Sequence, residues 1–142
     1  MHKLLVPVDQ SENAIRALDH AIRLAKELGG TALHIVNAHE PTIVYGEVAL
    51  YLPEEKARAL QKEHSEDQLR PALERARAAN VPFTSEILVG DVPHAIAKCA
   101  EDRSCDGIVM GTRGMGTIGS LLLGSVAMKV IHLAKVPVTL VK

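Results

Sequence analysis

Residues 109–127 read VMGTRGMGTIGSLLLGSVA, and this stretch says most about the fold. It joins the end of an apolar, strand-like run to a glycine-rich loop, and the loop closes on Gly124 and Ser125 at the start of a helix-patterned segment. Glycine lets a backbone approach an anion closely, and the free N–H groups of a helix's first turn attract negative charge. The order of strand, glycine-rich loop and helix therefore predicts a site for phosphate.

Two common phosphate-binding loops do not fit this spacing. A P-loop requires Lys followed by Ser or Thr after its last glycine, whereas Gly124 is followed by Ser125 and Val126. The dinucleotide-binding fingerprint has more closely spaced glycines and follows the first strand of its unit, whereas this loop follows a late strand. The residues instead match Gly-x2-Gly-x9-Gly-Ser, at Gly111, Gly114, Gly124 and Ser125.

That spacing resembles the ATP-binding branch of the universal stress protein family, and the resemblance runs from end to end. Four further segments match in the family's order. They are the opening Pro-x-Asp at residues 7–9, LHIV at 33–36, VGDVP at 89–93 and VPVTLV at 136–141. The resemblance therefore implies a single nucleotide-binding domain of this family over residues 1–142.

Composition agrees with a globular domain that does not bind nucleic acid. A chain of 142 residues can bury a core, and 47% of it is hydrophobic while 23% is charged. The formal net charge is −1, so the chain has no overall positive charge that would attract nucleic acid. Aromatic residues make up 2%, which leaves almost no rings on which bases could stack. No segment approaches the roughly 20 apolar residues of a membrane span. We expect a cytoplasmic protein without membrane insertion, with Cys99 and Cys105 as buried free thiols rather than metal ligands.

Hydrophobic periodicity predicts five strands that alternate with helices. The strands are expected at about residues 3–8, 31–38, 83–89, 106–110 and 137–141. The first helix is expected from Ser11 to Gly29, the second from Pro53 to about residue 79, the third to begin after Asp91, and the fourth over about residues 125–134. Ser11 and Asp91 are the expected N-caps. Pro71 is expected to kink or split the long second helix near Arg70. The alternation predicts an α/β three-layer sandwich with a parallel sheet and helices on both faces, and the resemblance implies a Rossmann-like strand order of 3-2-1-4-5.

In such sheets, ligands bind beyond the carboxyl ends of the strands, where the strand order reverses. In the order that the resemblance implies, the reversal lies between the first and fourth strands. These strands end at Pro7-Val8-Asp9 and at Met110-Gly111. Two motifs that are distant in the sequence are therefore expected to meet in one crevice.

The resemblance implies that this crevice holds ATP, or ADP or AMP, with Mg²⁺ beside the phosphates. Asp9 suits the ribose hydroxyls, while Pro7 and Ile35 would line the adenine pocket, with the Ile35 backbone reading the base edge. Residues 111–114 would wrap the ribose and phosphates, and residues 124–126 would face the outer phosphates. The candidate nucleotide-binding residues are Pro7, Asp9, Ile35, Met110, Gly111, Thr112, Arg113, Gly114, Gly124, Ser125 and Val126.

Some of these residues also have a structural interpretation. Asp9 is suited to anchoring a turn before the first helix, and the loop glycines are suited to tight turns alone. The seven histidines are scattered and lack the i, i+4 spacing of a helical zinc site, and His34 on the second strand is expected to be structural. No catalytic or metal-binding residue is therefore assigned.

The sequence favours a binding protein over an enzyme, because it contains neither a Gly-x-Ser-x-Gly elbow nor the kinase motifs. Through the resemblance, the expected function is nucleotide-dependent regulation in a stress response. One alternative is a slow ATPase or autophosphorylating phosphotransferase, with Thr112, Thr117, Ser120 or Ser125 as phosphate acceptor. Another is an interaction module that needs no nucleotide.

The last strand bears on assembly. Residues 136–141 would form an exposed apolar edge, which proteins normally cover. Pairing with a second copy across a two-fold axis removes that edge, and the family dimerises in this way. The sequence therefore predicts a homodimer through this strand.

Overall fold

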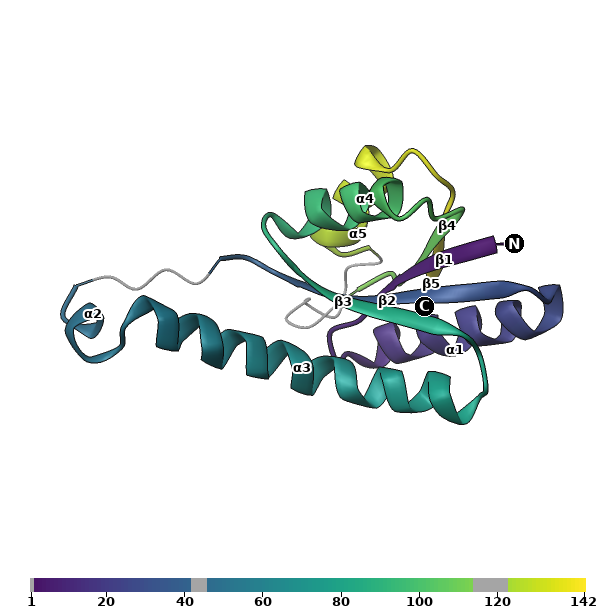
Figure 1. The fold of residues 1–142 in the computed structure, drawn as a ribbon. Helices are drawn as coiled ribbons and strands as arrows, with labels where there is room; N and C mark the ends of the chain where they lie inside the picture. Colours follow the sequence, from purple (N-terminus) through teal and green to yellow (C-terminus); the bar gives the residue numbers. More distant parts are fainter. Residues whose placement is uncertain (1, 42–45, 114–122) are drawn as a thin grey trace.

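The computed structural model describes residues 2–41, 46–113 and 123–142, and it places five parallel strands in one sheet (Figure 1). The strands are β1 (His2–Pro7), β2 (Thr31–His39), β3 (Phe83–Val89), β4 (Gly107–Gly111) and β5 (Val138–Val141). The helices are α1 (Glu12–Leu28), α2 (Val48–Tyr51), α3 (Glu54–Ala78), α4 (Val92–Asp102) and α5 (Ser125–Leu133). The strand order is β3-β2-β1-β4-β5, which confirms the expected topology.

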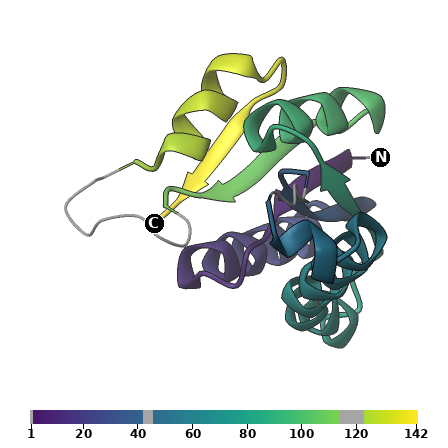
Figure 2. The ribbon, with the colours of Figure 1, turned by 90° about the vertical axis from the view of Figure 1, so that its left-hand side faces the viewer.

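Helices cover both faces of the sheet, so the fold has three layers. Figure 2 shows α4 and α5 on one side of the strands and α1 and α3 on the other. Successive strand residues point to opposite faces, so Val6 packs in the core under α1 and α3 while its neighbour Leu5 packs under α4 and α5. On β2, Ile35 likewise packs in the core under α1 and α3, and Val36 in the core under α4 and α5. This double burial explains why the central strands are apolar without alternation.

The helix caps lie where the sequence predicts them. The Ser11 hydroxyl accepts a hydrogen bond from the N–H of Ala14 at the start of α1, over 3.1 Å. The Asp91 carboxylate accepts from the N–H of His94 over 3.3 Å, with Pro93 in the first turn of α4. Both caps satisfy N–H groups that have no partner inside the helix.

The expected split at Pro71 is wrong, because α3 is one helix of 25 residues that contains this proline. Pro71 lies on the exposed side of the helix, while Leu69, Ala72 and Ala76 are buried in the core between α1, α3 and the sheet. Packing on both sides of the proline therefore keeps the helix continuous despite the missing N–H. None of the described helices, α3 included, is long and apolar enough to cross a membrane.

Both cysteines are buried free thiols, as expected. Cys99 and Cys105 are 4% and 5% exposed and pack in the core under α4 and α5.

Candidate functional site

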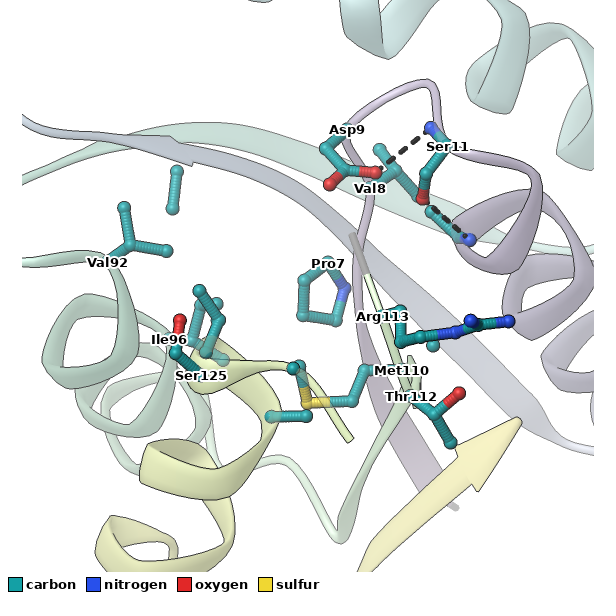
Figure 3. A pocket seen from close by; sticks show the side chains of 16 residues that line it. Pro7, Val8, Asp9, Ser11, Val92, Ile96, Met110, Thr112, Arg113 and Ser125 are labelled. Atoms are coloured by element: carbon teal, nitrogen blue, oxygen red, sulfur yellow. Dashed lines mark hydrogen bonds between the residues drawn. The ribbon is translucent and has the colours of Figure 1, made fainter. Parts of the chain in front are cut away.

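A cavity lies beyond the carboxyl ends of β1 and β4, where the strand order reverses (Figure 3). Its volume is about 180 Å³. The lining residues are Pro7, Val8, Asp9, Ser11, Ala14, Ala38, Val92, Ile96, Met110, Gly111, Thr112, Arg113, Gly124, Ser125, Val126 and Ala127. The segment after β1 and the segment after β4 therefore meet in one crevice, as the strand order requires.

The turn after β1 holds Asp9 at the edge of this cavity. One carboxylate oxygen of Asp9, Oδ1, accepts a hydrogen bond from the Ser11 N–H over 3.0 Å, and Ser11 in turn caps α1 (Figure 3). Asp9 thus anchors a turn, which is the structural role that the sequence left open, and it also lines the cavity. The hydrogen bond from Ser11 fixes the position of the Asp9 carboxylate.

Thr112 joins the three elements around the mouth of the cavity. Its N–H donates to the Val141 carbonyl at the end of β5, over 3.0 Å, and its own carbonyl accepts from the Gly124 N–H over 2.7 Å. The Thr112 side chain is 7% exposed, and its hydroxyl lies 3.5 Å from the Asn13 amide nitrogen. The Gly124 N–H, which the sequence analysis assigned to a phosphate, is therefore engaged within the protein.

The first turn of α5 lies at the same cavity. Ser125, Val126 and Ala127 occupy this turn and line the cavity. N–H groups at these positions have no acceptor inside a helix, and the helix dipole adds partial positive charge. Ser125 and Val126 are exposed, so the turn is open to a ligand.

Arg113 and Asp9 are the charged side chains among the described lining residues. In Figure 3 the Arg113 side chain extends away from Ser125. The two side-chain charges offset each other, so the helix terminus is the main attraction for an anion.

An apolar wall closes the other side of the cavity. It consists of Ala38 from β2, Val92 and Ile96 from α4, and Met110 from β4. Sequence reasoning missed the first three, although Val92 and Ile96 have the i, i+4 spacing of one helix face. Such a wall suits a flat, largely apolar group.

The structure does not bring Ile35 to this cavity. Its side chain is fully buried in the core under α1 and α3, on the opposite face of the sheet. Ala38 is the β2 residue that lines the cavity, because it shares the α4 face with Val36. Gly114 lies outside the described residues, as do Thr117 and Ser120.

Gly111 has a packing role that is independent of any ligand. A Cβ at this position would lie 2.8 Å from Cβ of Asn13 and 2.9 Å from its carbonyl carbon. Only glycine therefore allows α1 to approach the end of β4 this closely.

Comparison with known proteins agrees with this arrangement. The family model described as "Universal stress protein family" matches residues 1–142. The chain belongs to the universal stress protein family. Universal stress protein MJ0531 of Methanocaldococcus jannaschii is 34% identical over 99% of this chain and 81% of that protein. Universal stress protein YxiE of Bacillus subtilis is 30% identical over 99% of each chain.

Solved structures of similar proteins share the fold. The structure of MJ0577, also from Methanocaldococcus jannaschii, superimposes with a TM-score of 0.84 at 28% identity, covering 99% of this chain and 94% of that one. A universal stress protein in complex with cAMP matches with a TM-score of 0.72 at 29% identity, covering 99% and 97% of the two chains. Members of the family with this fold therefore include one that has been solved with an adenine nucleotide.

Proposed function

We propose that this universal stress protein binds an adenine nucleotide in the cavity between β1, β4 and α5, and that it acts as a nucleotide-dependent regulator. The observation that carries the proposal is the meeting of Asp9 with the first turn of α5 around an apolar wall. Asp9 suits ribose hydroxyls, the wall suits a base, and the helix terminus suits phosphate. The similarity to a protein solved with cAMP supports the same ligand class.

The size of the cavity indicates how such a ligand would lie. A cavity volume of about 180 Å³ is smaller than the roughly 300–1,000 Å³ of pockets that enclose a whole ligand. We therefore place the base and ribose between Ala38, Ile96 and Asp9. The phosphates would extend over the exposed N–H groups of Ser125 and Val126.

ATP is the proposed ligand, with ADP and AMP as weaker ones, because each further phosphate adds charge near the first turn of α5. Mg²⁺ is proposed to accompany ATP. Oxygen ligands suit this ion, and the phosphates would supply most of them. Asp9 is the carboxylate that the described lining residues offer.

The cavity favours binding over catalysis. Turnover requires a nucleophile, a base or a clamp that is positioned on the reacting atoms. The Thr112 hydroxyl is buried beside Asn13, whereas the Ser125 hydroxyl lies on an exposed residue of the cavity. Ser125 is thus the residue that supports the alternative of a slow phosphotransferase.

Calorimetric titration of the purified chain with ATP, ADP, AMP and cAMP, with and without Mg²⁺, tests the proposal. We expect saturable binding of ATP, tighter than that of AMP. Mass spectrometry of the denatured protein would identify a nucleotide that copurifies. Absence of binding by all four ligands would contradict the proposal, and sustained release of phosphate from ATP would favour the enzyme.

We also propose a homodimer through β5. In the sheet, β4 flanks β5 on one side, and no other described strand pairs with its second edge. Pairing of two β5 strands across a two-fold axis would satisfy the main-chain groups along both edges.

A further inference from the structure

Three side chains that the nucleotide site does not use meet between the sheet and α4. They are His34 from β2, Glu86 from β3 and Cys99 from α4. His34 Nε2 lies 3.0 Å from Glu86 Oε1, and Cys99 Sγ lies 3.3 Å from the same oxygen. All three potential ligand atoms lie within 4.8 Å of one another. One nitrogen, one oxygen and one sulfur from three separate elements therefore surround one point.

The fold holds the cluster in place: His34 and Cys99 are buried, Glu86 is partly exposed, and neighbouring side chains hold His34 and Glu86 from outside. His34 and Cys99 are each 4% exposed. The Thr84 hydroxyl lies 2.6 Å from His34 Nδ1, which leaves Nε2 facing Glu86 and Cys99. Histidines that bind metals have an outer partner of this kind on their second nitrogen.

Arg103 fixes the Glu86 carboxylate from the other side. Its Nη2 donates to Oε2 over 2.8 Å, and its Nε donates to Oε1 over 3.1 Å. A cation at Oε1 would replace the second contact and leave the first intact. Arg103 would then act as the outer partner of a ligating carboxylate.

We propose that His34 Nε2, Glu86 Oε1 and Cys99 Sγ bind a zinc ion. Mixed nitrogen, oxygen and sulfur ligands are those that Zn²⁺ takes, and three protein ligands leave its fourth position for water. A groove of about 410 Å³ reaches Glu86 and Cys99 and gives the ion and the water a path. One thiolate and one carboxylate neutralise the charge of the ion.

Binding releases a proton from the cysteine. Burial, followed by the contact with Glu86, raises the pKa of the Cys99 thiol to about 12, so the metal-free protein holds this group protonated at neutral pH. Zinc takes the sulfur as thiolate, and the proton passes to the solvent.

Cobalt titration of the full chain tests the site, because Co²⁺ bound to a thiolate absorbs in the near ultraviolet. The protein is first reduced, stripped with a chelator and desalted. We expect a thiolate-to-cobalt band that saturates at one metal per chain and disappears when Zn²⁺ is added. Absence of the band in the unmodified protein would overturn the proposal whatever any variant does.

Two cysteine variants assign the ligand. Cys99→Ser should abolish the band, while Cys105→Ser should keep it, because Cys105 is equally buried but lies outside the cluster. Thr84→Val should weaken Co²⁺ binding by about tenfold, the usual effect of losing an outer partner. A band that survives Cys99→Ser and disappears with Cys105→Ser would contradict the assignment.

Discussion

Gln10 Nε2 donates a hydrogen bond to the main-chain carbonyl of Asp67, 3.3 Å away. Asp67 lies four residues before Pro71, so its carbonyl has no helical N–H partner. A side chain from the turn beside Asp9 thus replaces the hydrogen bond that the proline removes. This contact links the middle of α3 to the edge of the proposed nucleotide site.

We expect Gln10→Ala to lower the free energy of unfolding by about 0.5 kcal/mol, the lower end of the range for one hydrogen bond, because the contact is exposed. In a Pro71→Ala background the same change should cost less, because residue 71 then offers an N–H to the Asp67 carbonyl. Urea denaturation of the four proteins measures both values. Equal costs in the two backgrounds would show that the contact with Gln10 does not compensate for the proline.

Gly111→Ala should destabilise the fold by about 2 kcal/mol, as overpacking does. The new Cβ would lie 2.8 Å from Asn13 Cβ and would push α1 away from β4. Gly107→Ala is the matched control on the same strand, because its Cβ would meet its nearest neighbours at 3.4 Å. Thermal unfolding followed by circular dichroism compares them, and similar melting temperatures would contradict the packing role of Gly111.

Val126→Asp should weaken ATP binding by at least about fivefold while leaving the fold intact. A carboxylate in the first turn of α5 suits the helix dipole but repels phosphate, and a like charge about 4 Å away costs about 1–4 kcal/mol. Met128→Asp is the control, since Met128 is exposed on α5 but does not line the cavity. Calorimetry should show a smaller loss for AMP than for ATP. Unchanged ATP affinity in Val126→Asp would place the phosphates elsewhere.

Leu140→Pro should convert the proposed dimer to monomer, whereas Leu140→Ala should leave it dimeric. The carbonyls of Pro137 and Val141 accept hydrogen bonds from β4, so the main-chain groups of Leu140, at the alternate position, face the open edge of β5. Proline removes the N–H there, and alanine removes only the side chain. Sedimentation velocity distinguishes the two states, and a dimeric Leu140→Pro protein would exclude this edge as the interface.

The cap of α4 gives the stability a specific dependence on pH. Hydrogen bonds from the side chain and the N–H of His94 lower the pKa of Asp91 below its ordinary value. A lowered pKa in the folded state means that the carboxylate stabilises the fold above its unfolded pKa of about 3.9, and that this contribution disappears as the pH falls through the folded value. Asp91→Asn keeps a capping oxygen but does not titrate. The difference in unfolding free energy between the two proteins should therefore shrink below about pH 4, and a constant difference from pH 7 to the acid limit would contradict the shift.

Signals that lie within one helix or strand could be read directly from the residues. Ser11 and Asp91 cap helices because their side chains reach N–H groups three residues on. The apolar runs of the strands reflect burial on both faces. The glycine-rich loop is recognised from the spacing of its glycines alone. The crevice between β1 and β4 followed once the family resemblance supplied the strand order.

Contacts between residues far apart in the chain emerged only in the folded protein. Pro71 remains in a helix because α3 packs on the sheet on both sides of it. Ala38 lines the cavity in place of Ile35 because the pleat and register of β2 turn one to each face. His34 and Cys99 meet at one oxygen of Glu86 although 65 positions separate them in the sequence. Sequence patterns report the geometry of one helix or strand, whereas these contacts arise from how separate elements pack together.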